Sequence, residues 1–275
     1  MKKILKIVSA IIIMALLVVA GYFAYVITTY SRIEDFLELE VTGVASWDGA
    51  TVGQEYTVVS QNIGFGAYTA DFTFFMDGGT ESRAASRDSV LNCINQAVNR
   101  IKSYNPDIVL FQEVDFVSTR SYHTDQREIL REAFSGFCGT YARNYHSAYL
   151  MYPVLEPHGK NNSGMLTLSN MNITEGLRRS FPIPTDFSKF LDLDRAYSIN
   201  RISMDNGKEL VVYNVHASAY ATSGDIRSEQ MSMLLNDMQK EYDNGNYCIA
   251  GGDFNADFTG NSVATLNNGI QSDMG

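Results

Sequence analysis

The alternation of apolar and polar positions along this chain predicts a succession of helices and strands. An apolar side chain recurs every three or four positions, as in an amphipathic helix, in residues 88–103, 125–135 and 225–242. Short runs of apolar and β-branched residues, which are typical of strands, occur at 56–60, 108–111, 141–152, 164–169, 196–204, 209–215 and 246–250. Asp205-Asn206-Gly207-Lys208 predicts a hairpin between the two runs that flank it. We therefore expect a layered α/β domain.

The first 30 residues differ from the rest because their apolar run is almost unbroken. Residues 7–27 are nearly all apolar, and Lys2, Lys3 and Lys6 precede them. A run of ~20 apolar residues crosses a bilayer, whereas the apolar part of a signal peptide is typically ~7–15 residues. We therefore expect residues 1–30 to be an uncleaved single-pass anchor in the cell membrane. The lysines place the N-terminus in the cytoplasm and the remaining chain outside.

Two other interpretations of this segment stay open. Cleavage after Val18-Val19-Ala20 would make the protein a secreted one, and a buried core helix would have a similar composition. Residues 31–55 are polar and acidic, which predicts a linker or an edge segment, and residues 56–275 then form a single domain. The aromatic residues of 64–82 either pack on this domain or cover a cleft or membrane.

The overall charge limits the classes of partner. The formal net charge is −10, so the broad basic surface of a nucleic-acid-binding protein is missing. A polyanionic substrate is still compatible with this charge, because a bound divalent cation reverses the local field. The three cysteines, Cys93, Cys138 and Cys248, have neither a disulfide pattern nor the spacing of a zinc site. No protein partner can be inferred.

Candidate chemistry is concentrated in Gly251-Gly252-Asp253-Phe254-Asn255, which follows the predicted strand 246–250. The two glycines are expected to end the strand and to let the backbone approach a ligand closely. Asp253 and Asn255 are two residues apart, so extended chain would present both on one face. A carboxylate that accepts a proton from water, beside an amide that donates to phosphate, suits hydrolysis of a phosphoester. The alternative is an Asx turn that only closes the strand.

Polar residues also end three other predicted strands: Asn62, Glu113 and His216. Each residue alone has an ordinary explanation, as a turn residue, a solvated carboxylate or a structural histidine. Their joint placement predicts a site, because sites in layered sheets are built at strand ends.

Five stretches of this chain resemble the endonuclease/exonuclease/phosphatase superfamily, the Mg-dependent phosphoesterases that include DNase-I-like nucleases and neutral sphingomyelinases. They occur in the family's order and are Ser60-Gln61-Asn62-Ile63, Pro106 to Val114, Gly164 to Ser169, Asn214-Val215-His216 and Gly251 to Asn255. The second and the last are the most specific. The resemblance implies a four-layer α/β/β/α sandwich of the DNase-I-like type, with the site at one edge of its two sheets.

The resemblance also implies roles for the residues at the strand ends. Glu113 would be the main ligand of Mg2+, with Mn2+ as an alternative, and Asn62 would lie beside it. Asp253 would orient or deprotonate the attacking water, while His216 and Asn255 would contact the phosphate. Asn214 would belong to the substrate-binding residues.

The resemblance fails at the C-terminus. The family closes with a strand that ends in an Asp-His pair, whereas Asp273 is followed here by Met274 and the chain stops at Gly275. His123, His146 and His158 come too early to replace that histidine. We therefore expect the sequence to be truncated by roughly 60–100 residues, the scale of one supersecondary unit, so that the sandwich is incomplete, a sheet edge is exposed and inactivity of this chain stays an open alternative.

These observations favour metal-dependent hydrolysis of a phosphoester by in-line attack of water. The substrate would be a lipid head group, a nucleic acid or a small phosphoester, cleaved by a phosphodiesterase or a phosphatase. A non-catalytic surface binding module on the same fold is the alternative function.

Overall fold

The computed structural model describes residues 2–185, 189, 193–219 and 224–256, and two five-stranded sheets lie face to face within them. The first sheet has the order β1 (Leu37–Leu39), β7 (Ile173–Ser180), β8 (Ala196–Ser203), β9 (Glu209–His216) and β10 (Tyr247–Asp253). The second has the order β2 (Val41–Gly43), β5 (Cys138–His146), β6 (Asn162–Ser169), β4 (Ile108–Asp115) and β3 (Val58–Asn62). Neighbouring strands are antiparallel except for two parallel pairs, β3 with β4 and β9 with β10.

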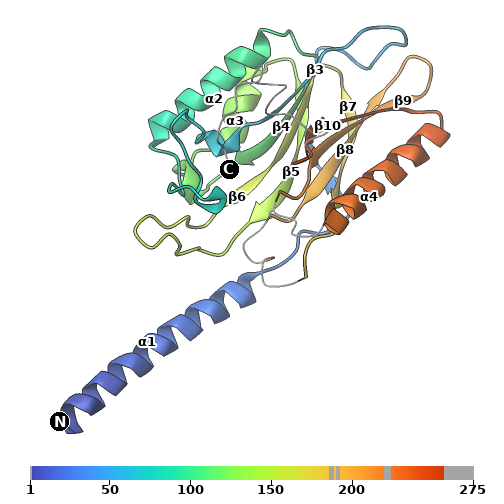
Figure 1. The fold of residues 1–275 in the computed structure, drawn as a ribbon. Coiled ribbons are helices and arrows are strands. Elements are labelled where there is room, and N and C mark those ends of the chain that lie inside the picture. Colours follow the sequence, from blue (N-terminus) through green and yellow to red (C-terminus); the bar gives the residue numbers. More distant parts are fainter. Residues whose placement is uncertain (1, 186–188, 190–192, 220–223, 257–275) are drawn as a thin grey trace, which may run out of the picture.

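Helices cover the outer face of each sheet, which completes four layers (Figure 1). α2 (Arg87–Lys102) and α3 (Gln126–Ala133) pack on the second sheet, and α4 (Gly224–Asp243) packs on the first. Short 3-10 helices are η1 (Gly64–Gly66), η2 (Phe75–Asp77) and η3 (Thr119–Ser121). The α/β/β/α sandwich expected from the sequence is thus confirmed. The three predicted helices also agree with α2, α3 and α4 to within about two residues at each end.

The burial pattern of β4 explains why its apolar run lacks alternation. Val109 and Phe111 pack against α2 and α3, whereas Ile108 and Leu110 point into the space between the sheets. A strand covered on both faces is apolar at every position. The space between the sheets also holds a buried polar network of side chains, formed by Gln112, Thr140, Thr167, Ser198, Asn200 and Asn214.

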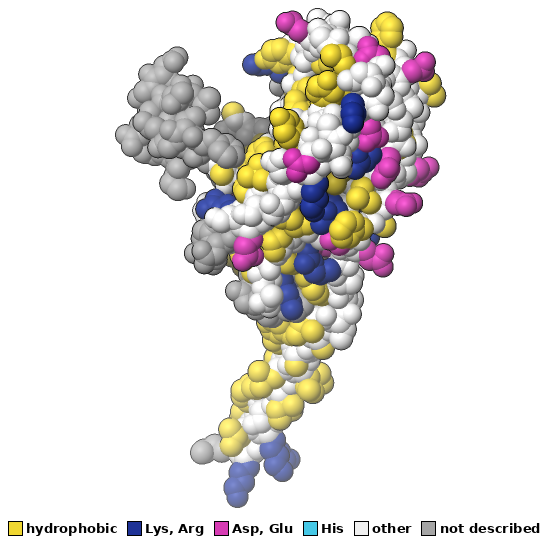
Figure 2. Space-filling view, turned by 90° about the vertical axis from the view of Figure 1, so that its right-hand side faces the viewer, with side chains coloured by type: hydrophobic (Ala, Val, Ile, Leu, Met, Phe, Trp, Pro, Cys, Tyr) yellow, Lys and Arg dark blue, Asp and Glu magenta, His cyan; other side chains and the backbone are white. Residues whose placement is uncertain are grey.

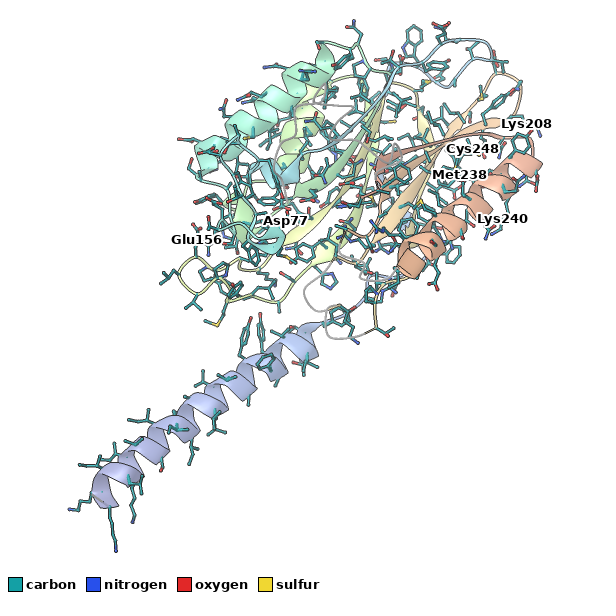
Figure 3. All side chains as sticks on the ribbon, viewed as in Figure 1. Asp77, Glu156, Lys208, Met238, Lys240 and Cys248 are labelled. Carbon is teal, nitrogen blue, oxygen red and sulfur yellow. The ribbon has the colours of Figure 1, made fainter. Side chains whose placement is uncertain are left out.

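Several local expectations need correction. β10 does not end before the glycines but continues through Gly251 and Gly252 to Asp253. For residues 31–55, the edge-segment alternative agrees with the structure, because β1 and β2 each add an edge strand to a different sheet. β7 was not expected, since charged residues interrupt its apolar pattern. The thiol of Cys248 donates to the carbonyl of Met238 on α4 at 3.6 Å, so this cysteine packs beneath the helix (Figure 3).

The N-terminal helix α1 (Lys2–Thr29) projects from the sandwich (Figure 1). Its most apolar window has a mean hydropathy of 2.7, and its side chains are almost all exposed. Hydrophobic side chains cover much of the visible face of the helix, and basic side chains lie at its free end (Figure 2). By length and composition, α1 is able to cross a membrane.

Candidate active site

The two parallel strand pairs bring the predicted site residues together. In one sheet Asp253 of β10 lies in register with His216 of β9, and in the other Asn62 of β3 lies in register with Gln112 of β4. Parallel strands end on the same side of a sheet, and both pairs end at the same edge of the sandwich. Their polar ends meet in one cleft of about 440 Å³, which is lined by Asn62, Glu113, His216, Asp253 and Asn255 among others.

Asn62 connects the two sheets at this edge. Its side-chain oxygen accepts a hydrogen bond from the Gly64 backbone amide at 2.9 Å, which turns the amide nitrogen toward the cleft. That nitrogen donates to Glu113 Oε1 at 3.1 Å and to Asp253 Oδ2 at 2.8 Å. One neutral amide therefore holds two carboxylates from opposite sheets next to each other.

A backbone irregularity directs Glu113 into the cleft. The pairing of β4 with β6 shifts between Phe111 and Val114, and Glu113 has a φ of +54°. A bulge of this kind re-aims a side chain, and a positive φ at a residue other than glycine is a strained conformation. Burial raises the pKa of the Glu113 carboxyl, and the positive charge of Arg120 and the Asn62 amide act in the opposite direction.

His216 faces both carboxylates. Its Nε2 lies 4.0 Å from Glu113 Oε1 and 3.9 Å from Asp253 Oδ2, and only 2% of its side chain is exposed. Burial lowers its pKa well below the usual value, and the charges of Arg195 and Arg120 lower it further. The ring is therefore neutral near pH 7. The Asn144 amide nitrogen lies 3.2 Å from Nδ1, and a hydrogen bond donated there would put the ring proton on Nε2, on the side of the two carboxylates.

Asn255 and Asn214 have different surroundings. Asn255 lines the cleft, where its amide nitrogen donates to the Ala217 carbonyl at 3.0 Å and its backbone amide donates to Asp253 Oδ1 at 2.9 Å. Asn214 is fully buried between the sheets and does not line the cleft. Its side-chain oxygen accepts a hydrogen bond from Gln112 Nε2 at 2.7 Å, and its side-chain nitrogen donates to the Phe111 carbonyl at 3.2 Å. This geometry suits a role in holding the sheets together.

Glycines permit the close approach of β10 to its neighbours. A Cβ atom on Gly251 would lie 2.7 Å from Leu110 Cδ1 of the facing sheet. A Cβ atom on Gly252, whose φ is +139°, would lie 2.1 Å from the Val215 carbonyl oxygen of β9. The carboxylate of Asp253 reaches Asn62 because neither position carries a side chain.

Sequence reasoning missed Arg120, which lines the cleft and is 3% exposed. Its guanidinium donates to both oxygens of Asp115 at 3.0 and 2.8 Å, lies 3.9 Å from the ring centre of Phe65, and lies 3.9 Å from Glu113 Oε2. Burial alone would lower the pKa of Arg120, but the neighbouring Asp115 and Glu113 carboxylates together with Tyr145 outweigh burial and raise that pKa. Its ion pair with Asp115 is the only signal that could have identified Arg120, and the spacing of the two residues in the sequence does not predict that pair.

The cleft is also lined by the less polar residues Tyr68, Phe74, Met76 and His158. Phe65, Phe72 and Phe74 pack on the core, so most rings of residues 64–82 cover the domain. Burial and the nearby Glu113 charge raise the pKa of Tyr68, which keeps its hydroxyl a donor. Burial lowers the pKa of His158 to about 4.

The donor atoms at the strand ends are compatible with a hard cation. Glu113 and Asp253 supply carboxylate oxygens, and Mg2+ is commonly held by one or two carboxylates together with water and substrate. No group of three or more His, Cys, Asp or Glu side chains that would hold a metal occurs within the described residues. Asp273, the nearest match to the closing motif, lies outside the described residues.

Comparison with known proteins identifies one family and several similar folds. The model of the Endonuclease/Exonuclease/phosphatase family matches residues 59–271. The structure of ANGEL2, a 2',3'-cyclic phosphatase, in complex with adenosine-2',3'-vanadate is 15% identical, with 84% of this chain and 60% of that chain covered and a TM-score of 0.49. The chain thus spans less than two thirds of ANGEL2.

Two further structures have similar folds. The human Nocturnin catalytic domain with bound sulfate is 18% identical, with 82% of this chain and 73% of that chain covered and a TM-score of 0.45. D. rerio TDP2 complexed with a single-strand DNA product is 15% identical, with 78% and 65% covered and a TM-score of 0.43. No curated protein matches this chain.

Proposed function

Because the chain belongs to the endonuclease/exonuclease/phosphatase family, a family of phosphoesterases, we propose that it hydrolyses a phosphoester by attack of water at phosphorus. The observation that carries this proposal is the Asn62 amide, which holds the Glu113 and Asp253 carboxylates together. His216 Nε2 lies about 4 Å from both. A proton acceptor and a neutral donor thus face the same small volume.

The protein groups would divide the work as follows. Asp253 would accept a proton from the attacking water, because it is a half-buried carboxylate at the strand end. His216 would donate its Nε2 proton to a phosphoryl oxygen that gains charge in the transition state. Asn255 would hold a non-bridging oxygen through the amide hydrogen that does not bond to Ala217. Asn214 would act indirectly, through the buried network.

Mg2+, or Mn2+ in its place, would be held mainly by Glu113, with Asp253 beside it, while the Asn62 amide nitrogen would lie next to the ion's site and orient both carboxylates. Two carboxylates share one neutral amide here, and burial disfavours the charged form of Glu113. A divalent cation would reverse that effect. When bound, the ion would neutralise charge on the phosphoryl and leaving oxygens.

The substrate would be a lipid head group, a nucleic acid or a small phosphoester. With a net charge of −10, binding to nucleic acid would lack a broad electrostatic contribution. The α1 helix would anchor the domain in the cell membrane as a single pass, with the domain outside.

The test uses the full chain in phosphatidylcholine nanodiscs. Plasmid DNA, sphingomyelin in the bilayer and soluble bis(p-nitrophenyl) phosphate are offered with Mg2+ or with EDTA. We expect hydrolysis of at least one substrate that requires Mg2+, is lost in Glu113→Ala and persists in Glu132→Ala, a change at an exposed helix position. If the chain hydrolyses none of them, the non-catalytic binding module becomes the better description.

A further inference from the structure

The loop between β5 and β6, residues 147–161, carries an apolar tip. The exposed fractions are 55% for Met151, 68% for Tyr152, 79% for Val154 and 100% for Leu155. Contiguous exposed apolar side chains mark an interaction surface, whereas single ones are ordinary. The tip has a defined shape, because backbone hydrogen bonds join Leu150 to Gly159 at 2.9 and 3.0 Å.

This loop is bound to α1. The Tyr22 hydroxyl accepts a hydrogen bond from the Met151 amide at 3.1 Å and donates to the Tyr149 carbonyl at 3.3 Å. The Tyr25 hydroxyl accepts from the Tyr149 amide at 3.1 Å. Tyr22 precedes the last residue of α1, Thr29, by seven positions, which corresponds to about 10 Å along the helix. The loop therefore extends alongside α1 rather than stopping where the helix ends.

We propose that residues 147–161 form a membrane-docking surface that inserts Met151 to Leu155 into the leaflet nearest the domain. The proposal rests on the role of α1 as a membrane span, which is part of the proposed function. Tyrosine is typical of the membrane–water interface, and Tyr22 and Tyr25 attach the loop at that depth. The loop lies on the side of the domain from which α1 leaves, as the position of Glu156 indicates (Figure 3).

The composition of the loop favours lipid hydrocarbon as the occupant. Glu156 and Lys160 are its charged residues, one of each sign, so attraction to anionic lipid contributes little. The exposed apolar tip is also continuous with the exposed apolar surface of α1. A zwitterionic leaflet therefore provides the chemistry that this surface needs.

The same arrangement places the cleft near the membrane. His158 belongs to the docking loop and also lines the cleft. On another side Leu193 lines the cleft and also a small pocket with Tyr30 and Ser31, which directly follow α1. Both segments lie at the membrane end of the domain, so the substrate class that fits best is a phosphoester carried by a lipid head group.

Fluorescence of a single tryptophan tests the docking. Trp47, the only tryptophan of the chain, is replaced by phenylalanine, and Leu155→Trp is introduced into the full chain in phosphatidylcholine nanodiscs. Val52→Trp is the matched control, since Val52 is also exposed but lies in a different loop. We expect lipids brominated along the acyl chain to quench the emission of L155W and to leave that of V52W unchanged. High salt should not reduce the quenching, because the contact is apolar.

Equal quenching of L155W and V52W would overturn the proposal, and so would coverage of the loop by protein, which gives no lipid quenching. Val154→Trp is a second probe in case L155W fails to fold, and it should behave as L155W does.

Activity then tests the consequence for the substrate. Leu155→Asp should slow hydrolysis of sphingomyelin in the bilayer and leave hydrolysis of soluble bis(p-nitrophenyl) phosphate unchanged, whereas Val52→Asp should affect neither. Slowing of both substrates by L155D, or of neither, would overturn the lipid assignment. If wild type hydrolyses nothing, the proposed function fails, while the quenching result still decides the docking.

Discussion

Two carboxylates on β4, two residues apart, have opposite surroundings. Asp115 is fully buried, and its oxygens accept hydrogen bonds from Arg120 and from the Ser121 hydroxyl at 3.0 Å. Glu113 is 20% exposed in the cleft and shares a single amide with Asp253. The bulge at Glu113 separates them. The comparison teaches that the carboxylate hydrogen-bonded to Arg120 stabilises the fold, while the one that only neighbours this cation, at 3.9 Å, is available for chemistry.

The largest effect that bears on this comparison is expected for the rate of hydrolysis when a carboxylate of the cleft is replaced. Asp253→Asn keeps the side-chain shape but removes the proton acceptor, so the rate of hydrolysis should fall by about 10²–10⁴-fold. The free energy of unfolding should stay nearly unchanged, because two neighbouring negative charges are reduced to one. Steady-state kinetics and urea denaturation measure the two quantities. The control is the exposed Asp48→Asn; a large loss of stability in D253N would contradict the division of roles.

Substitution of the buried carboxylate, Asp115, should lower the stability of the fold. Asp115→Asn removes the hydrogen-bonded counter-charge of the buried Arg120 guanidinium and leaves only Glu113, 3.9 Å away, so the free energy of unfolding should fall by about 3–5 kcal/mol. Asp125 forms a similar pair with Arg127 at 2.7 Å, but both side chains are partly exposed. Asp125→Asn should therefore cost less than about 1 kcal/mol. Denaturant unfolding measures the free energy of unfolding of both variants. Equal losses in D115N and D125N would contradict the difference expected between the buried and the partly exposed ion pair.

A pH dependence follows from the histidine in the cleft wall. Burial lowers the pKa of His158 to about 4. Below pH ~6.5 the unfolded chain therefore binds a proton at His158 that the folded chain excludes. The free energy of unfolding is unaffected by His158 above pH ~6.5 and falls as the pH decreases toward about 4. His158→Gln should remove roughly 3 kcal/mol of this decrease.

Thermal unfolding of wild type and H158Q over this pH range measures the effect. The variant at the exposed His123, H123Q, is the control and should retain the wild-type profile. Parallel curves for wild type and H158Q would contradict the assignment.

The smallest effect concerns the cation itself. Mg2+ at about 100 times its dissociation constant should stabilise the folded chain by about 2.7 kcal/mol, through binding to the folded state alone. EDTA should reverse the rise in melting temperature, and Glu113→Gln should abolish it. Glu132→Gln should retain it. An equal Mg2+ response in E113Q would remove Glu113 from the ligand set.

Much of the fold was predictable because its elements have distinct periodicities. The stripes of α2 and α4 and the apolar runs of β4 and β9 are local patterns, and local patterns survive in a single sequence. β7 escaped prediction because it alternates with charged residues, among them the buried Arg178, whose guanidinium donates to the Arg143 carbonyl at 2.7 Å. That contact depends on tertiary structure.

The candidate site divides in the same way. Asn62, Glu113, His216 and Asp253 were recognisable because each ends an apolar run, and the structure gathers them in one cleft. Arg120 follows no such run, and its position depends on Asp115 and Phe65. Asn214 shares a motif with His216 and, two residues away on β9, points to the same face, but it lies deeper between the sheets and does not reach the cleft. The roles of these residues and the expected truncation stay predictions.

The two glycines of β10, Gly251 and Gly252, show how the geometry of the cleft could be disrupted without changing a polar residue. A methyl group at Gly252 would clash with the backbone of β9, and one at Gly251 would clash with Leu110 of the facing sheet. Asn62 and Asp253 would then separate, although every polar residue remained intact. Every candidate catalytic group would still be present, but the two carboxylates would no longer face the same volume.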